Sequence, residues 1–481
     1  MISKPILTGI SRLLLLLTTF IPLRAETTFL ANYDDSLKAN FAKGNPEAFL
    51  GPDVKEGEVK LVKDGRFGGG VYLGRQIPPL ALNYLLSKNL DPQQGTIEFW
   101  FRPEWDSTFT EKEGPAWLKG GTLVPLFGTS GITTNLSIGK NQYNVLFFNY
   151  ILNYKTLGTV WLNGNFWQKG RWDFYAVSWD ADEARLFLNG RLLAVADYWR
   201  PVEGGIGDRF TLGNVSYGET GAAFGTFDDL RISDEKLYIS SFPVPDAPLQ
   251  VSKSGPKFSP AQPALTPAEK DLLNQEKVLF LVEMKDGLAA KFAQGSPLPH
   301  TNQLLTTAAV GPVQALKLRQ NPGGCADTLA YESKAHFNPM LGQAGLEVLW
   351  EILPAAPVVL ADFSKPVMAP GRSHQRCDLR TGRRLVLQPG FRLEAQIWQD
   401  GKVISSVSSQ ALNLTANTWH SFGFGWQGSS LAIYLDGKEL ASSIGNPFPS
   451  EYSKYMFFGA DSQGAGSLDG WLRKITVSLK I

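Results

Sequence analysis

The chain has few of the residues on which nucleophilic and metal sites are usually built. Among its 481 residues are two cysteines and four histidines. The histidines, His300, His336, His374 and His420, all lie in the second half and lack the spacing of zinc ligands. The first half contains neither a histidine nor a cysteine. The sequence therefore offers no zinc motif and no nucleophile paired with a histidine base.

An excess of charge of one sign is also missing. The chain carries 46 basic and 45 acidic residues, a net charge of +1. Such a balance gives no general attraction to nucleic acid or to an acidic membrane surface. We therefore expect no nucleic-acid partner.

Long apolar runs are absent as well. Residues 13–17 are all leucine, but with Phe20 and Ile21 they remain far short of the roughly 20 apolar residues that span a bilayer. Lys4 and Arg12 precede this run, and a small residue follows at Ala25. The pattern predicts a signal peptide over residues 1–25, with a retained anchor as the alternative. We expect a secreted, periplasmic or cell-surface protein that meets the membrane only through its export signal.

What the chain does contain is β-forming sequence. Aromatic residues make up 12% of it, and 48 glycines and 30 prolines separate short aromatic and β-branched runs. Helical periodicity is scarce. This punctuation is typical of an all-β sandwich.

One stretch occurs twice. Residues 172–194 read WDFYAVSWDADEARLFLNGRLLA, and residues 419–441 read WHSFGFGWQGSSLAIYLDGKELA. The offset is 247 throughout (419 − 172 = 247), without a gap. The equivalent pairs are Trp172 and Trp419, Trp179 and Trp426, Leu188 and Leu435, Gly190 and Gly437, and Ala194 and Ala441. Asn-Gly in one copy and Asp-Gly in the other predict a tight turn between two strands. The chain is an internal duplication.

A proline-rich segment divides the two copies. Seven prolines lie between 242 and 267, a composition that favours extended conformations and disfavours sheet. We predict a first domain over 26–241, a semi-rigid linker over 242–274 and a second domain over 275–481. Within the linker, Thr266, Pro267 and Glu269 are typical of the start of a short helix.

The rest of the duplication follows the same order. The further matches are 35–44 with 286–295, 70–73 with 315–318, 96–101 with 346–350, and 225–232 with 470–477. In the first copy the motifs read DDSLKANFAKG, GRFGGGVYL, GTIEFWFRP, LFLNGRL and FDDLRIS. This series resembles the laminin-G-like domains of the concanavalin A-like jelly-roll family. The resemblance implies an all-β chain of two antiparallel jelly-roll β-sandwiches in tandem, the second degenerate. It implies little about activity, because the architecture hosts lectins, adhesion modules, glycosidases and spacers.

Glycoside hydrolysis requires two carboxylates on either side of one bond. Glu98 is followed on its own strand face by Trp100 and Arg102, so the first copy has no pair. In the second copy Glu347 and Glu351 share a face, but four residues of strand separate them by roughly 13 Å. We therefore predict a protein that is not an enzyme, with a glycoside hydrolase as the weakest alternative.

Two further features have mainly structural interpretations. Cys325 and Cys377 are expected to form a disulfide in an exported chain. The acids of Asp228-Asp229 and of the turn 180–183 are candidate calcium ligands. The competing interpretation makes Asp182 and Glu183 solvated turn residues, and makes Asp228 a partner of Arg231. We predict no cofactor and keep calcium as the alternative.

Aromatic and arginine side chains are the best candidates for binding a ligand. Indole rings suit the apolar faces of sugars, although several of the tryptophans outside the repeat positions are also suited to filling the ends of a sandwich. The arginine-rich segment 371–384 is suited to sulfate or carboxylate groups, or is simply a solvated loop. The candidate ligand-binding residues are Trp105, Trp117, Trp161, Trp167, Trp199, Arg372, Arg376, Arg383 and Arg384.

Together these patterns predict an exported recognition protein whose partner is a polysaccharide or a cell-surface protein. A structural or adhesion scaffold without a small ligand is the alternative. The oligomeric state is left open.

Overall fold

The structure is a computed structural model, and it describes residues 25–51, 57–74, 82–106, 124–131, 135–141, 145–152, 155–163, 167–196, 205–213, 223–252, 265–301, 305, 307–320, 326–368 and 375–479. For 150–163, 366–368 and 375–379 only the backbone is described. The predicted signal peptide up to residue 24, Trp117, Trp199, Arg372 and Cys325 lie outside these ranges. Within them, no helix combines the length and hydrophobicity needed to cross a membrane.

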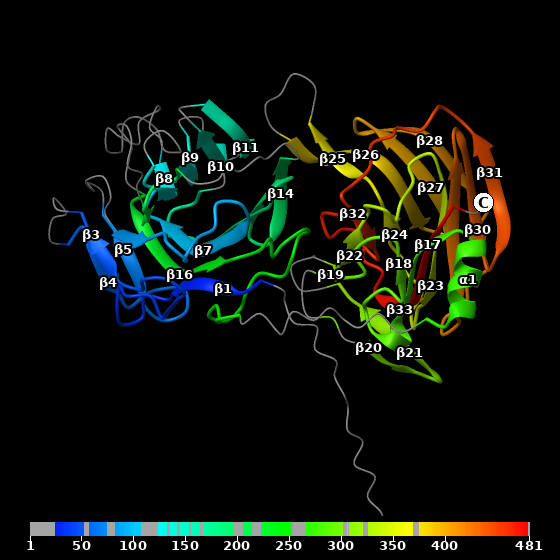
Figure 1. Cartoon of the computed structure of the whole chain (residues 1–481), viewed down its shortest axis with the longest axis horizontal. Helices are drawn as coiled ribbons and strands as arrows, with labels where there is room; N and C mark the ends of the chain where they lie inside the picture. Colours follow the sequence, from blue (N-terminus) through cyan, green and yellow to red (C-terminus); the bar gives the residue numbers. More distant parts are fainter. Residues whose placement is uncertain are drawn as a thin grey trace, which may run out of the picture.

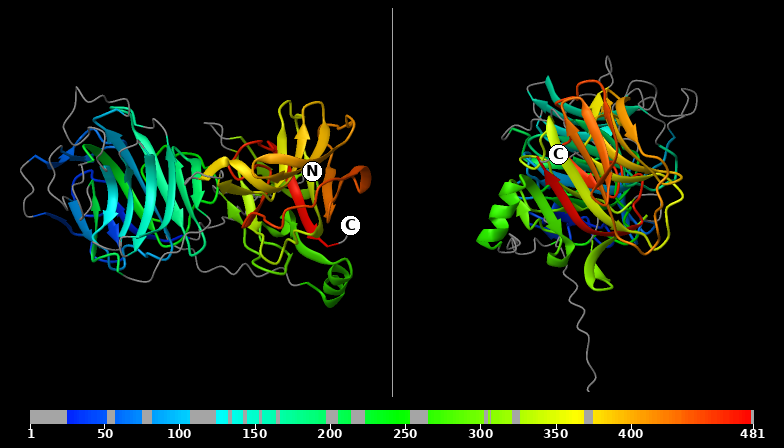
Figure 2. Two further views of the ribbon diagram at one scale, coloured as in Figure 1. Left: turned by 90° about the horizontal axis from the view of Figure 1, so that it is seen from above. Right: turned by 90° about the vertical axis from the view of Figure 1, so that its right-hand side faces the viewer.

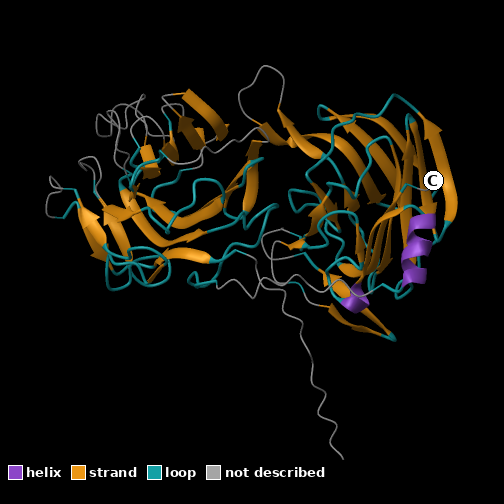
Figure 3. Ribbon diagram, in the orientation of Figure 1, coloured by secondary structure: helices purple, strands orange, loops and turns teal. Residues whose placement is uncertain are grey.

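The described residues form two antiparallel β-sandwiches that lie side by side (Figures 1 and 2), so the all-β prediction is confirmed. Figure 3 shows how little helix accompanies them: α1 (Pro267–Gln275) on the second sandwich and the short η1 (Met284–Asp286). Thr266 caps α1, and Glu269 completes the capping box, as the sequence predicts.

The first sandwich is built from sheets A and B. Sheet A runs β14 (Arg191–Ala196), β13 (Ala184–Leu188), β12 (Asp173–Trp179), β7 (Gly95–Pro103), β16 (Gly225–Ser233), β1 (Thr27–Ala31) and β2 (Phe41–Ala42), with β5 (Gly70–Leu73) on β16 and β4 (Val59–Val62) on β5. Sheet B runs β11 (Lys155–Asn163), β10 (Val145–Leu152), β9 (Asn135–Lys140), β8 (Val124–Thr129), β15 (Arg209–Leu212), β6 (Leu82–Leu85) and β3 (Ala48–Leu50).

The second sandwich repeats this plan in sheets C and D. Sheet C runs β18 (Phe292–Ala293), β17 (Val278–Glu283), β33 (Gly470–Ser478), β23 (Leu341–Leu349), β29 (His420–Gln427), β30 (Ser430–Leu435) and β31 (Lys438–Ile444), with β21 (Val313–Leu318) on β33 and β20 (Thr307–Val310) on β21. Sheet D runs β19 (His300–Thr301), β22 (Leu329–Glu332), β32 (Tyr455–Phe458), β24 (Val358–Asp362), β26 (Gln375–Gln388), β27 (Arg392–Gln399) and β28 (Lys402–Ser408), with β25 (Lys365–Met368) on β26.

The repeated stretch forms the predicted strands and turns in both copies. Asn189 and Gly190 have φ angles of 49° and 70°, and Asp436 and Gly437 have φ angles of 51° and 79°. Both residues of each turn are therefore left-handed, as a type I′ hairpin requires. In both copies the first turn side chain accepts a hydrogen bond from the strand it faces: Asn189 from the N–H of Phe174, and Asp436 from the N–H of Ser421.

The duplication extends to single hydrogen bonds. The Tyr84 hydroxyl donates to the carbonyl of Leu37, and the equivalent Tyr331 hydroxyl donates to that of Leu288. Asn89 accepts from the N–H of Gly44 at 2.8 Å. At the equivalent place His336 Nε2 accepts from the N–H of Gly295 at 2.8 Å. The second copy has thus replaced an amide by an imidazole while keeping the bond.

One match made from the sequence has the wrong register. Trp179 pairs with Gly95, and Trp426 pairs with Gly342, so these glycines are equivalent. Trp350 therefore does not correspond to Trp100. It has instead the role of Trp105: the two indoles donate to the carbonyls of Leu468 and Ala223, respectively, each at 2.8 Å. The sequence match set Thr96 against Leu346, an offset of 250, whereas the paired glycines keep the offset of 247 (342 − 95 = 247), so the match was displaced by three residues.

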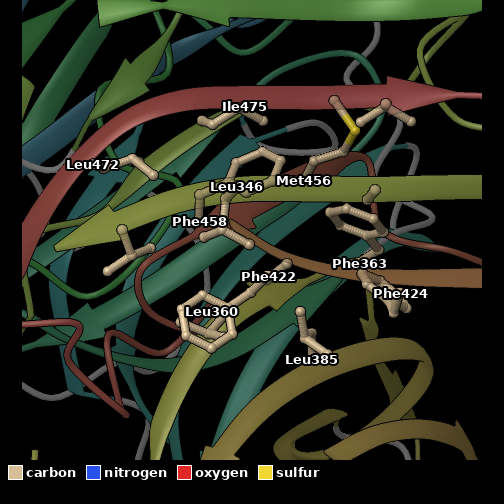
Figure 4. Close-up of a cluster of buried hydrophobic side chains, with 14 of the residues drawn as sticks. Leu346, Leu360, Phe363, Leu385, Phe422, Phe424, Met456, Phe458, Leu472 and Ile475 are labelled. Atoms are coloured by element: carbon tan, nitrogen blue, oxygen red, sulfur yellow. The ribbon is translucent and has the colours of Figure 1, made fainter. Parts of the chain in front are cut away.

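Each sandwich has its own apolar core between its two sheets. Figure 4 shows that of the second, where Leu346, Phe422 and Ile475 of sheet C meet Leu360, Leu385 and Phe458 of sheet D. Each sandwich therefore buries apolar side chains of its own.

Residues 234–252, which we call the strap, cross the outer face of sheet A. Tyr238 and Phe242 stack with ring centroids 3.6 Å apart and cover Phe187 of β13. At its far end Ser252 is hydrogen-bonded to Thr27. The first part of the predicted linker, 242–252, is therefore bound to the first sandwich rather than being a free spacer.

His336 gives a prediction from this fold. Burial lowers the pKa of His336, and its Nε2 must stay unprotonated to accept from Gly295. A base whose folded pKa is depressed stabilises the fold above its unfolded pKa of about 6.5 and loses that contribution as the pH falls. We expect His336→Ala to cost about 2 kcal/mol at pH 8. His336→Asn, which installs the residue of the first copy, should cost less and weaken the loss of stability between pH 7 and 5, measured by urea unfolding. An unchanged pH profile in His336→Asn would contradict this.

Candidate functional site: the outer face of sheet B

A row of polar side chains crosses sheet B from strand to strand. Pairing partners in adjacent antiparallel strands project on the same side of a sheet. The backbone register runs Asn83 (β6), Thr211 (β15), Gly128 (β8), Ser137 (β9) and Asn149 (β10). We call these five residues the polar row. Their chain neighbours, among them Tyr84, Phe210, Ile138 and Phe148, lie in the core, so the row belongs to the outer face.

The polar atoms of this row are only partly satisfied. Thr211 and Asn83 bond to each other at 2.8 Å. Ser137 Oγ, both side-chain polar atoms of the neighbouring Asn135, and Asn149 Oδ1 have no hydrogen-bond partner among the described residues. Ser137 and Asn135 are each only 1% exposed. An unsatisfied buried polar group costs about 1–3 kcal/mol, so we expect these atoms to bond to water or to a ligand.

Aromatic residues lie beside the polar row on the same strands. Phe147 is two residues before Asn149 and therefore on the same face of β10. Its register partner in β11 is Trp161, one of the predicted ligand-binding residues, whose side chain lies outside the described residues. The face thus combines amides and hydroxyls with aromatic positions, the composition expected for binding a sugar.

Two other predicted tryptophans lie in the core. Trp105 and Trp167 are each 2% exposed, and their ring centroids are 5.7 Å apart. They fill the interior of the first sandwich, the alternative that their sequence context left open. They belong to the apolar core between the two sheets and not to the outer face of sheet B, so we leave them out of the site.

Within the arginine-rich segment, residues 375–384 belong to a strand and not to the solvated loop that the sequence suggested. Arg383 and Arg384 lie within strand β26. Arg383 is fully buried among the rings of Phe337, Trp426 and Phe448, and burial lowers its pKa to about 10. Arg384 is paired with Asp461 at 2.9 Å. These two arginines therefore do not form a surface for sulfated or uronic ligands. Arg376 is described by its backbone alone, in the same strand.

The acids considered for calcium have other partners. Glu183 is buried and is held by Arg185 and Lys236, so it is not a solvated turn residue. Asp228 accepts from the N–H groups of Arg66 and Phe67, and Arg231 pairs with Glu98 instead. Among the residues that the structure describes, no three acidic, histidine or cysteine side chains are grouped so as to hold a metal.

The acids considered for hydrolysis are also engaged. Glu98 bonds to Arg231 and to the Tyr238 hydroxyl. Glu347 bonds to Arg473, and Glu351 to Lys317 and Trp471. The disulfide between Cys325 and Cys377 remains a prediction, because Cys325 and the Cys377 side chain lie outside the described residues.

Residues 83–238 match a laminin-G-type family model described as the concanavalin A-like lectin/glucanases superfamily. The matched range includes every member of the polar row. The first sandwich is a laminin-G-like domain. The expected family and fold are thereby confirmed for this domain, and the second sandwich has the same sheet order. No curated protein sequence matches the chain.

Solved structures show more distant likenesses. Domain 4 of the extracellular arabinanase AbnA of Geobacillus stearothermophilus, in complex with arabinotriose, is 17% identical over 44% of this chain and 95% of its own, with a TM-score of 0.29. Domains LG4-5 of the mouse laminin α1 chain are 10% identical over 91% and 92%, with a TM-score of 0.25. The CBM40 domain of the Ruminococcus gnavus IT-sialidase is 15% identical over 35% and 91%, with a TM-score of 0.27. These likenesses identify neither a ligand nor an activity.

The pair Asp228 and Asp229 gives a second prediction. Burial raises the pKa of Asp228 to about 6 and that of Asp229 to about 7, and Asp34 adds to both shifts. An acid whose folded pKa is raised stabilises the fold while it is protonated, so stability falls as the pH rises from about 4 to 7. Asp229→Asn should remove part of this loss and stabilise the protein at pH 8 by at most about 4 kcal/mol. Asn also tolerates the positive φ of this position, 50°.

The exposed Asp64 supplies the control for this measurement. It pairs with Arg102 at the surface, and Asp64→Asn should change the stability at pH 8 by less than about 1 kcal/mol. If urea unfolding shows the same pH profile in Asp229→Asn and in the unmodified chain, the buried carboxyl does not have the role assigned to it.

Proposed function

We propose that this protein is an exported, non-catalytic glycan-binding protein, and that the outer face of sheet B of the first sandwich holds the sugar. The unsatisfied amide and hydroxyl groups of Ser137, Asn135 and Asn149 carry this proposal. Sugar hydroxyls both donate and accept hydrogen bonds, and amide and hydroxyl side chains offer both in return. The aromatic positions 147 and 161 would meet the apolar faces of the rings.

The chemistry of the polar row favours a neutral polysaccharide. None of its five residues is charged. Arg209, which lies two residues before Thr211 on β15, is already paired with Asp208 at 3.0 Å. An anionic sugar would therefore find no unpaired cation among these residues, whereas a neutral one needs none.

Variants of the polar row test this proposal, and the equivalent position of the second copy supplies the control. Ser137→Ala and Asn149→Ala should each weaken binding to the polysaccharide identified on a glycan array by about tenfold, the loss of one or two hydrogen bonds. Because these variants remove unsatisfied polar atoms, their melting temperatures should stay equal or rise. Gln396→Ala, the equivalent of Asn149 in the second copy, should leave binding unchanged.

Two results would contradict the proposal. One is unchanged binding in Ser137→Ala and Asn149→Ala. The other is a strong loss of stability in both, which would show that the two side chains serve the fold. If no glycan on the array binds, the scaffold alternative, with a cell-surface protein as partner, takes the place of the glycan.

A further inference from the structure

The second sandwich has a row equivalent to the polar row, but with different chemistry. In sheet D the register runs Ala330 (β22), Phe457 (β32), Asp362 (β24), Arg384 (β26) and Gln396 (β27). At the offset of the duplication Ala330 stands for Asn83 (330 − 83 = 247). Phe457 pairs with Ala330 as Thr211 pairs with Asn83, so Phe457 takes the place of Thr211. The end of the row that is polar in the first copy is thus apolar in the second.

The first sandwich covers this apolar end. Ile239 of the strap forms one buried cluster with Ala330, Tyr455 and Phe457, and all four are at most 2% exposed. Strand β14 of the first sandwich also contacts β26. Figures 1 and 2 show the two sandwiches meeting at this place. The face that carries the polar row in the first copy is, in the second copy, a contact surface for the first sandwich.

A charge network surrounds the apolar contact. Glu183 binds Arg185 through both carboxylate oxygens, at 2.8 and 3.0 Å, and binds Lys236 at 2.6 Å. Lys454 of the second sandwich reaches Asp180 and Asp182 of the first, each at 2.8 Å. Burial alone would raise the pKa of Glu183, but Arg185 and Lys236 outweigh it and hold that pKa well below its usual range. The network is charged and is complete only when the two sandwiches are together.

A pocket of about 320 Å³ lies beside the network and is lined by both sandwiches. Its three cations, Arg185, Lys365 and Lys454, are each paired with an acid. The pocket therefore lacks the excess of positive charge that would attract an anion.

We infer that the outer face of sheet D, which is equivalent to the proposed ligand face of the first copy, serves in the second sandwich as a permanent docking face. The two sandwiches then form one rigid unit with one ligand face. The number of ligand faces rests on the function proposed above, whereas the docking does not. The partner that fits this surface is the first sandwich of the same chain.

The test measures docking without any ligand. By scanning calorimetry the intact chain should unfold in one transition, because each sandwich loses buried contacts when the other unfolds. Lys454→Glu puts a third acid against Asp180 and Asp182, and Ile239→Asp puts a charge into the apolar contact. Each should split the transition into two. Lys317→Glu breaks an ion pair with Glu351 inside the second sandwich and should leave a single transition.

Several results would overturn the inference. Two transitions in the unmodified chain, or a single transition kept by both Lys454→Glu and Ile239→Asp, would show that docking does not couple the sandwiches. A dimer by light scattering that Lys454→Glu converts to monomer would show that the contact forms between two chains. Titration calorimetry with a short oligosaccharide should give one site per chain, and two sites would overturn the single ligand face. If no glycan binds but the chain unfolds in a single transition that Lys454→Glu and Ile239→Asp split, the proposed function is contradicted and the docking is supported.

Discussion

The structure depends on the burial of Glu183 with its charged partners. A buried charge is tolerated only when it is paired, and removing one partner from such a group costs about 3–5 kcal/mol. Arg185 comes from the strand next to Glu183, but Lys236 comes from the strap. Lys236 also binds Asp180, which binds Lys454 of the second sandwich. The hairpin of β12 and β13, the strap and the second sandwich must therefore all be folded together before each of these charges has its partner.

The two copies differ on the faces of their sheets that are covered in one copy and open in the other. On the outer face of sheet A, Trp100 and Phe174 are covered by apolar residues of the strap. At the equivalent positions of sheet C stand Glu347 and Ser421. Between the outer faces of sheets B and D the difference has the opposite sense. Apolar Ala330 and Phe457 of sheet D stand where sheet B has the polar residues Asn83 and Thr211. Each replacement matches what covers that face: apolar under the strap and at the contact between the sandwiches, polar elsewhere.

Much of the fold could be predicted from the sequence because its signals are local. Asn189-Gly190 and Asp436-Gly437 specify their turns by backbone conformation, and the alternation of apolar residues specifies the strands. The site was harder to predict. The motif Asn135-Leu136-Ser137-Ile138 alternates clearly, but only the pairing of β9 with β8 and β10 shows that Ser137 joins a row with Thr211 and Asn149.

The errors share a cause. Glu183 looked like a turn residue, Arg383 like part of a loop, and Trp105 like a surface aromatic, because a single sequence does not show what packs on a residue from far along the chain. Arg383 is buried by the rings of Phe337, Trp426 and Phe448, which lie 43 to 65 positions away and become neighbours only after the sheets have formed. The strap was missed for the same reason, since its prolines suggest a spacer while its Tyr238 and Phe242 need the finished face of sheet A.

Small-angle X-ray scattering of residues 26–481 can show whether the two sandwiches form one rigid unit in solution. Two domains joined only by a linker move independently by default, and a buried contact between them removes that freedom. If the sandwiches are docked, a single arrangement reproduces the scattering curve at low and at high salt, because salt does not screen the apolar contact of Ile239 with Ala330, Tyr455 and Phe457. A curve that only an ensemble of separated sandwiches can fit would contradict it.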